Sequence, residues 1–237
     1  MTNRNAIHLQ GVEFAWPQGD PVLDIAELTV AAGERVFVKG PSGSGKTTLL
    51  SLVGGIVTPQ RGTVQVLGQD LGPLSGAQRD RFRAHHIGFI FQMFNLIPYL
   101  TVLENVLLPC RFSSLRRRRM AAAGETPPAA ATRLLLQLDL SESLLHVPVT
   151  RLSVGQQQRV AAARALIGAP ELVIADEPTS ALDTDRRRAF LSLLQQECQR
   201  SNTTLLFVSH DDALENAFQR TVHLPAMNRA SRQEVVA

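Results

Sequence analysis

The sequence predicts an α/β fold with a mainly parallel sheet, an antiparallel β part near the N-terminus and an inserted α-helical subdomain. Three features of the chain support this prediction. In the C-terminal part, short continuous apolar runs alternate with helical stretches, as in a parallel sheet covered on both faces. Near the N-terminus, apolar and polar residues alternate in the manner of half-buried strands. From Thr101 to about Ala169, a Leu-, Ala- and Arg-rich stretch has helical spacing.

In the N-terminal part we expect strands at Ile7–Phe14 and Leu28–Val30. Trp16, the only tryptophan, lies between them and is followed by Pro17. An exposed aromatic ring in such a loop could stack on a nucleotide base. Judged from its local sequence alone, a partly buried packing role is the more common one.

The most specific motif is GPSGSGKTT at residues 40–48, which matches the P-loop pattern G-x-x-x-x-G-K-[ST]. Its glycines let backbone N–H groups point at phosphate oxygens, while Lys46 adds a charge and Thr47 a hydroxyl for Mg²⁺. An apolar strand is expected before it at Glu34–Lys39, and a helix that starts near Lys46 and ends at Gly54-Gly55 is expected after it. A merely flexible Gly/Ser turn would need neither feature. The residues expected to bind phosphate are Gly40, Pro41, Ser42, Gly43, Ser44, Gly45, Lys46, Thr47 and Thr48.

The middle of the chain is predicted to be mixed and then helical. A strand at Gly62–Leu67 and a basic helix at Ala77–His85 precede the strand Ile87–Phe91, which brings Gln92 to its end. Within the helical stretch, Gly124 and Pro127-Pro128 are interruptions, so residues 116–128 are expected to be a solvated helix end and loop.

In the C-terminal part, the apolar runs Leu172–Ala175 and Thr203–Val208 are predicted as buried parallel strands. Helices are expected at Asp183–Arg200 and Asp211–Ala217, and the tail from Met227 to Ala237 is polar. Ligands of such sheets bind at the carboxyl ends of the strands. Four polar residues follow strands there: Gln92, Asp176, Glu177 and His210.

These four residues suggest metal and phosphate chemistry. Asp176 could hold Mg²⁺, and Glu177 could orient or deprotonate an attacking water. His210 could donate to a γ-phosphate, and Gln92 could contact the metal or the water. The alternatives are that the two carboxylates cap the next helix and that the histidine is structural. The nearby P-loop favours the functional interpretation.

A second anion-binding element is indicated at residues 152–156, LSVGQ, before an Ala-rich helix. It offers the Ser153 hydroxyl and the Gly155 N–H at a helix N-terminus. An ordinary serine N-cap is the alternative, and local physics alone favours it.

Composition restricts the class of protein. The chain has 237 residues, 44% of them hydrophobic, a formal charge of +3 and a pI near 9.4. This fits one domain with a subdomain.

The basic excess is local, in Arg116–Arg119 and in Arg79, Arg81 and Arg83, and a solvated face is its commoner explanation. Cys110 and Cys198 lack metal or disulfide spacing, which fits a reducing compartment. No apolar run approaches the roughly 20 residues needed to span a bilayer, so a cytosolic protein, or one held to a membrane by a partner, is expected.

Together the motifs resemble the nucleotide-binding subunits of ATP-binding cassette (ABC) transporters, over nearly the whole chain. The P-loop is similar to Walker A, Gln92 to the Q-loop, LSVGQ to the signature, LVIADE to Walker B, SALD (Ser180–Asp183) to the D-loop and Ser209-His210 to the switch histidine. The resemblance implies a P-loop NTPase core of RecA-like type that binds ATP and Mg²⁺ and hydrolyses ATP. It also implies catalytic roles for Glu177, His210, Lys46 and Gln92, and metal contacts from Thr47, Gln92 and Asp176.

The resemblance further implies a head-to-tail pair of chains. ATP at one P-loop is then closed by Ser153, Gly155 and Gln156 of the other copy, with Asp183 of the D-loop at the same interface. Trp16 takes the place of the usual A-loop tyrosine, which implies stacking on adenine.

Within the family, residues 87–109 are similar to the group that includes LolD, MacB and FtsE. This implies an integral membrane permease of MacB/LolCE type as partner, and a peripheral position on the cytoplasmic face of the inner membrane without direct insertion or nucleic-acid binding. The task driven could be export, extraction of lipids or lipoproteins, or mechanotransmission. The alternatives are an FtsE-like regulatory ATPase, an importer cassette and a nucleic-acid-associated ABC ATPase.

One departure from the family pattern concerns Val154, which stands where the signature usually has glycine. A positive φ there would strain a β-branched residue by about 1 to 3 kcal/mol. The loop near residues 124–131 is also atypical. We expect a core of residues 1–91 and 170–225, a helical subdomain at about 92–169 and a tail at 226–237.

Overall fold

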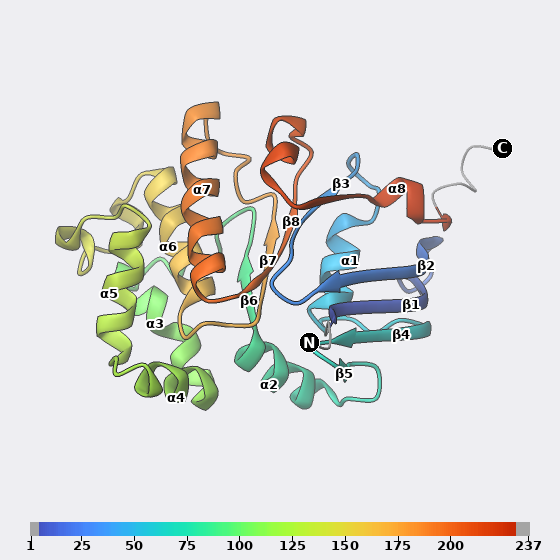
Figure 1. Cartoon of the computed structure of the whole chain (residues 1–237), viewed down its shortest axis with the longest axis horizontal. Helices are drawn as coiled ribbons and strands as arrows, with labels where there is room; N and C mark the ends of the chain where they lie inside the picture. Colours follow the sequence, from blue (N-terminus) through green and yellow to red (C-terminus); the bar gives the residue numbers. More distant parts are fainter. Residues whose placement is uncertain (1–4, 231–237) are drawn as a thin grey trace.

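The computed structural model describes residues 5–230, which form two sheets and a helical lobe. Figure 1 shows the antiparallel sheet on the right, the helical lobe on the left and the parallel sheet between them. The antiparallel sheet has the order β2-β1-β4-β5. Its strands are β1 (Asn5–Ala15), β2 (Pro21–Ala31), β4 (Arg61–Val66) and β5 (Gln69–Asp70). The predicted antiparallel part is confirmed, although β2 begins well before Leu28 because Pro21 already pairs with Ala15.

The second sheet has the order β6-β7-β8-β3-β9, and all its neighbouring strands are parallel. Its strands are β3 (Arg35–Lys39), β6 (Ile87–Ile90), β7 (Leu172–Asp176), β8 (Thr204–Val208) and β9 (Arg220–His223). The predicted parallel α/β core is therefore confirmed. β9 was not expected, since its sequence RTVH carries too little apolar pattern to indicate a strand.

Alternate residues of the parallel strands face two different hydrophobic clusters. Val173 and Ala175 belong to the cluster that contains α6 (Val154–Leu166) and α7 (Thr184–Arg200). Leu172 and Ile174 belong to the cluster that contains α1 (Lys46–Val53) and the antiparallel sheet. Because side chains alternate across a strand, α1 and α6 pack on opposite faces of the parallel sheet.

The inserted segment is helical, as expected, but its middle differs from the prediction. The lobe consists of α3 (Val102–Phe112), α4 (Ser114–Ala122), α5 (Pro127–Gln137) and the 3₁₀ turns η1 (Glu142–Leu144) and η2 (Val149–Arg151), with α2 (Gly76–His86) beside it. The solvated helix end and loop expected over residues 116–128 is confirmed for the exposed end of α4 and the turn at residues 123–126, but it is wrong for the buried Arg116 and Met120 and for Pro127, where a new helix begins. Gly124 follows the end of α4 with φ 73°, and Pro127 starts α5, because proline suits the first helical position.

Arg116 explains why α4 is ordered. Its side chain is 1% exposed, and its guanidinium donates to the carbonyl oxygens of Ala84 (2.9 Å), Ile87 (2.7 Å), Ala165 (3.2 Å) and Ile167 (2.7 Å). Burial lowers the pKa of this guanidinium to about 10. The expectation of a solvated basic face is therefore wrong for Arg116, which joins α4 to the C-terminal end of α6 and to β6.

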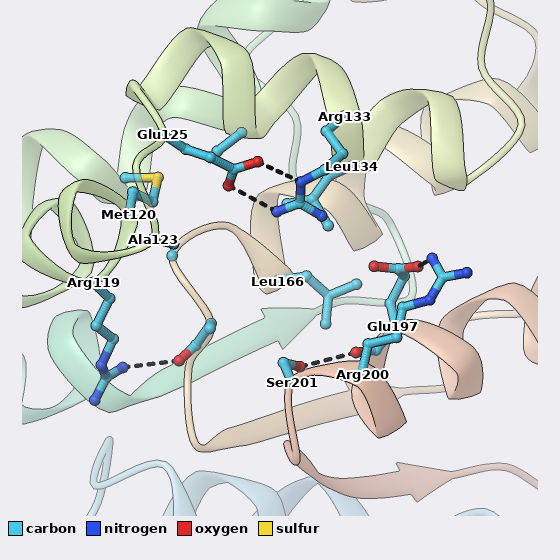
Figure 2. A pocket seen from close by; sticks show the side chains of 13 residues that line it. Arg119, Met120, Ala123, Glu125, Arg133, Leu134, Leu166, Glu197, Arg200 and Ser201 are labelled. Carbon is cyan, nitrogen blue, oxygen red and sulfur yellow. Dashed lines mark hydrogen bonds and ion pairs between the residues drawn. The ribbon is translucent and has the colours of Figure 1, made fainter.

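A cavity of about 190 Å³ lies between α4, α5 and α7, and Figure 2 shows its walls. An ion pair between Arg133 Nε and Glu125 Oε1 (2.7 Å) crosses one side, and the nearly buried Glu197 pairs with Arg200 on the other. The apolar part of the wall includes Met120, Leu134 and Leu166. Each of these two ion pairs therefore lies on its own side of the cavity (Figure 2).

The end of the described chain also departs from expectation. After β9 comes α8 (Leu224–Met227), and Asn228 and Ala230 are buried, so the first residues of the expected polar tail pack against the fold. Residues 231–237 lie outside the described part.

Helix α7 is present as predicted. The helix expected at Asp211–Ala217 is instead the 3₁₀ segment η3 (Asp212–Ala217). No helix among residues 5–230 has the length and apolarity that a bilayer span requires.

Candidate functional site

The P-loop connects β3 to α1 with the backbone that the motif predicts. Gly43 and Gly45 have φ of 81° and 90°. Gly45 is the N-cap of α1, no side chain caps this helix, and its first turn carries no acidic residue. The first N–H groups of a helix lack partners within the helix and carry a partial positive charge. This N-terminus therefore fits an anion such as a phosphate group.

Two of the loop glycines are also required by close packing. A Cβ atom on Gly45 would lie 2.8 Å from Leu23 Cδ2 and 3.2 Å from the carbonyl oxygen of Val22. A Cβ atom on Gly40 would lie 2.5 Å from Ser44 Oγ. This Oγ is buried and has no hydrogen-bond partner among the residues that the structure describes. The loop is thus packed so tightly that any larger residue at Gly40 or Gly45 would displace its backbone.

Lys46 lies across the loop. Its Nζ donates to the carbonyl oxygens of Gly40 and Pro41, each at 2.8 Å. Both partners are neutral, so the ammonium charge is available to an anion bound in the loop. Ser42 and Thr47 are exposed at the surface of the loop, whereas Thr48 is buried in the first turn of α1.

Oxygen atoms suited to a hard cation meet at the end of β7. Thr47 Oγ1 donates to Asp176 Oδ2 at 3.3 Å. Burial raises the pKa of the Asp176 carboxyl, the nearby Glu177 carboxylate raises it as well, and the hydrogen bond from Thr47 acts in the opposite direction. Among residues 5–230, no group of three or more His, Cys, Asp or Glu could hold a metal ion. Mg²⁺ is usually bound by one or two carboxylates together with substrate phosphates, so the present donors fit it.

Glu177 and His210 are brought together from the ends of β7 and β8. Glu177 Oε1 lies 2.9 Å from His210 Nδ1. Glu177 also has φ of 46°, in the left-handed region that non-glycine residues rarely adopt, and its N–H donates to the Val208 carbonyl oxygen at 2.9 Å. The alternative that Asp176 and Glu177 cap the next helix is wrong, because Asp183 caps α7 by accepting from the Arg186 N–H at 3.0 Å.

Gln92 and Trp16 are the other residues expected to contact the metal or the nucleotide. Gln92 is exposed in the turn after β6, and the pairing of Ile90 with Ala175 places that turn beside the end of β7. Trp16 follows β1, is 46% exposed and contacts Phe14 edge-on, with ring centroids 5.1 Å apart. The ring thus has both a packing contact and an open surface, and its contact with adenine stays a prediction.

The signature segment forms an ordinary helix start within one chain. Ser153 Oγ accepts from the Gln156 N–H at 3.3 Å, and Gln156 Oε1 accepts from the Ser153 N–H at 2.9 Å, which is a capping box. Val154 is the first residue of α6 and does not have a positive φ, so the condition under which a β-branched residue would be strained is not met. The surface at Gly155 is open, because a Cβ atom added there would have Leu182 Cδ2, at 3.7 Å, as its nearest neighbour.

Sequence reasoning missed the side chains that hold these loops in place. Arg164 of α6 donates to the carbonyl oxygens of Phe94 and of Asn95 (2.6 Å) in the segment that follows Gln92. Gln158, fully buried on the same helix, donates to the Pro178 carbonyl oxygen at 2.6 Å, just after Glu177. Both partners are distant in sequence, so no local pattern indicates these contacts.

The chain is similar to several known proteins over most of its length. The family model described as ABC transporter matches residues 23–180. The lipoprotein-releasing system ATP-binding protein LolD of Anaeromyxobacter dehalogenans is 44% identical over 92% of this chain and 90% of its own length. The macrolide export ATP-binding/permease protein MacB of Rhodopirellula baltica is 40% identical over 92% of this chain, which spans only 31% of MacB. A dimeric post-hydrolysis structure of the ATP-binding cassette MJ0796 with ADP and Pi has a TM-score of 0.82 and 33% identity, covering 95% of each chain.

Proposed function

Since the chain belongs to the ABC transporter family, we propose that it is the ATP-hydrolysing subunit of a complex in which two copies close around ATP and drive a membrane partner. The observation that carries this proposal is the meeting of separate segments at the carboxyl edge of the parallel sheet. The P-loop, the Thr47–Asp176 contact of 3.3 Å and the Glu177–His210 contact of 2.9 Å all lie there.

We assign the steps of hydrolysis to these residues. The α1 N–H groups and Lys46 bind the phosphates, and Lys46 balances the charge that develops on them. Glu177 accepts a proton from the water that attacks the γ-phosphorus, as the bond from this phosphorus to the bridging oxygen of ADP breaks. His210 holds Glu177 in position through its Nδ1. Mg²⁺, held by Thr47, Asp176 and Gln92, would neutralise phosphate charge when bound.

A second copy is proposed because the two anion-binding elements of one chain belong to different layers. The P-loop precedes α1 and Ser153 precedes α6, and these helices pack on opposite faces of the parallel sheet (Figure 1). In a head-to-tail pair, Ser153, Gly155 and Gln156 of one copy close the P-loop of the other, and Asp183 lies at the same interface. Solved structures of the similar cassette MJ0796 are described as dimeric.

The nucleotide base is assigned to the turn between β1 and β2. Its half-exposed Trp16 indole would stack on adenine, because the open face of the ring offers the contact that any purine uses. Apart from this stacking, the proposed site binds phosphate and metal only.

The membrane partner is assigned to an apolar groove beside the Q-loop. The groove, of about 380 Å³, includes Ile56, Phe91 and Phe112, and the neighbouring Met93 and Tyr99 are 80% and 83% exposed. Large exposed apolar side chains gathered in one place mark an interaction surface. We propose that a short helix of a permease binds in this groove, with the chain lying peripherally on the cytoplasmic face of the inner membrane.

The substrate class follows only from the relatives. Lipoprotein release and macrolide export are the tasks that their names state, so we propose lipids, lipoproteins or drugs as what the partner moves. Nucleic acid is disfavoured, because several arginines of the basic clusters are engaged internally. Arg79 and Arg83 donate to the carbonyl oxygens of Gly55 and Gly54, each at 3.1 Å, and Arg116 is buried.

We further propose two lobes within the chain, a core of residues 1–91 and 170–225 and a helical subdomain of about 92–169. Movement of one lobe against the other would carry the effect of hydrolysis to the groove, which both lobes line.

The proposed function is tested with Glu177→Gln and Lys46→Ala, and with Glu142→Gln as a matched control at an exposed position. Glu177→Gln should bind ATP, hydrolyse it poorly and accumulate as a dimer in size-exclusion chromatography, whereas Lys46→Ala should lose ATP binding. Undiminished turnover by Glu177→Gln would remove the assigned base.

The partner is tested with tagged Glu177→Gln protein in its native host. Membranes are solubilised with ATP present, and co-purifying proteins are identified by mass spectrometry. An integral membrane protein with few spans and a large extracytoplasmic domain supports the proposal. Recovery of ribosomes or DNA-associated proteins instead would reject it.

A further inference from the structure

The segment after β9 returns to the N-terminal hairpin and is fixed there by Asn228. Its side chain is fully buried. Asn228 Oδ1 accepts from the Asp24 N–H at 2.8 Å, and Nδ2 donates to the Val22 carbonyl oxygen at 2.8 Å. The backbone joins in, since the Arg229 N–H donates to the Asp24 carbonyl oxygen at 2.9 Å. One amide therefore ties the first residues of β2 to the C-terminal part of the chain.

These residues of β2 lie between two parts of the proposed nucleotide site. On one side, the pairing of Pro21 with Ala15 closes the turn that carries Trp16. On the other side, the β2 segment is packed against the P-loop. A Cβ atom on Gly45 would lie 3.2 Å from the Val22 carbonyl oxygen, the same atom that accepts the hydrogen bond from Asn228.

The segment also contacts the start of the P-loop. A Cβ atom on Gly40 would lie 3.2 Å from Pro225 Cδ in α8. Pro225 and Ala226 line an open hollow of about 460 Å³ together with Gly40, Pro41 and His210. The C-terminal segment is therefore part of the wall of the site, although Asn228 itself faces β2.

A purely structural explanation accounts for some of these contacts. β2 is an edge strand, and covering its backbone groups prevents pairing with other chains. Arg220 contributes at the far end of β2, where its Nη2 donates to the Thr29 carbonyl oxygen at 2.6 Å. Asn228 differs because the residues that it holds touch the phosphate loop and adjoin the Trp16 turn.

We propose that Asn228 is a positioning residue for the nucleotide, which fixes the spacing between Trp16 and the P-loop and does not itself touch ATP. This inference rests on the proposed ATP binding and on the stacking of adenine on Trp16. The two elements bind opposite ends of one ligand, so whole ATP needs them at a fixed distance. Tripolyphosphate, which lacks the base, needs only the P-loop.

The test compares Asn228→Ala with wild type and with Arg229→Ala, whose exposed side chain lies next along the chain and whose backbone bond is kept. Trp16 is the only tryptophan, so its fluorescence reports ligand binding at the turn without interference. ATP and tripolyphosphate are titrated into each protein by isothermal calorimetry, and Trp16 fluorescence is followed with ATP.

We expect Asn228→Ala to bind ATP about tenfold more weakly, a loss within the range that a base–aromatic stack supplies. Its affinity for tripolyphosphate and its kcat at saturating ATP should be unchanged, and Arg229→Ala should match wild type. The change in Trp16 fluorescence on ATP binding should also shrink. In a Trp16→Ala background, Asn228→Ala should add little further loss, because both substitutions remove the same contact.

The outcomes separate this inference from the proposed function. If wild type fails to bind ATP, the proposed function itself fails. If wild type binds ATP and Asn228→Ala binds it equally well, the positioning role is rejected. It is also rejected if Asn228→Ala loses affinity for ATP and for tripolyphosphate by the same factor. Should Asn228→Ala not fold by circular dichroism, Asn228→Asp keeps an acceptor for the Asp24 N–H and removes the donor to the Val22 carbonyl oxygen. Unchanged ATP affinity in this variant would equally reject the role.

Discussion

Replacing Arg116 with methionine tests whether one buried guanidinium holds the helical lobe to the parallel sheet. Methionine keeps the apolar stem of the side chain and removes every donor. The carbonyl oxygens of Ala165 and Ile167 end α6, and helix-terminal carbonyls have no partner within their own helix. Without Arg116 they lose this donor, as do the carbonyl oxygens of Ala84 and Ile87.

The expected loss of stability is about 3 kcal/mol. A hydrogen bond to a charged donor contributes roughly 1.5 to 3 kcal/mol, so the four bonds of Arg116 together contribute at least about 6 kcal/mol. Against this stands the burial of the charge. The pKa of Arg116 falls from 12.5 to about 10 because burial disfavours the charged form, which corresponds to about 3 kcal/mol. The Arg116→Met variant lacks these hydrogen bonds but also avoids the cost of burying a charge, so the difference of about 3 kcal/mol remains.

The assay is urea unfolding of Arg116→Met and of Arg118→Met, which changes an exposed arginine on the same helix. Arg118→Met should lie within about 0.5 kcal/mol of wild type. Arg116→Lys should also be destabilised, because an ammonium lacks the planar fork that reaches several carbonyls at once. If Arg116→Met is as stable as wild type, the carbonyl bonds of Arg116 do not hold the lobe and the reasoning fails.

Three further predictions concern single residues. Asp176→Asn should raise the free energy of unfolding at pH 7 while abolishing hydrolysis. The raised folded pKa of Asp176 means that its charge costs stability above that pKa, so the advantage of asparagine should disappear as pH falls below 3.8 in denaturant titrations. Gly88→Ala should cost about 3 kcal/mol in the same assay, since its Cβ would lie 2.2 Å from the Ala165 carbonyl oxygen, whereas Gly76→Ala, with no atom within 4 Å, should be neutral or stabilising. Val154→Gly should lower stability by at most about 1 kcal/mol and should not raise the ATPase rate, because Val154 is already helical.

The parts of the fold that sequence predicted well depend on local signals. The strand, loop and helix around the P-loop follow from an apolar run, glycines with positive φ and a helix start within about 20 residues, and all three are present. The buried strands β7 and β8 were likewise evident from continuous apolar runs. The polar residues after these strands meet as expected, because strand order alone brings parallel carboxyl ends to one edge.

The parts that sequence missed depend on distant partners. Arg116 stands in a run of four arginines, and nothing local distinguishes the buried one from its exposed neighbours. Its acceptors lie 29 to 51 residues away. Asn228 is similar, since the strand that it holds is more than 200 residues away. Pro127 misled for another reason, because proline is typical both of loops and of the first turn of a helix.

The proposed second copy agrees with the way the strands are covered. In β7, every residue from Leu172 to Ala175 is fully buried, so each face of the strand must be covered by a different layer. The chain covers one face with α1 and the other with α6, and each helix begins with an element suited to an anion. The two N-termini therefore belong to different layers of one chain. In the proposed head-to-tail pair, another molecule of the same sequence brings its signature element to the P-loop, and the two-fold symmetry of the pair completes both sites at once.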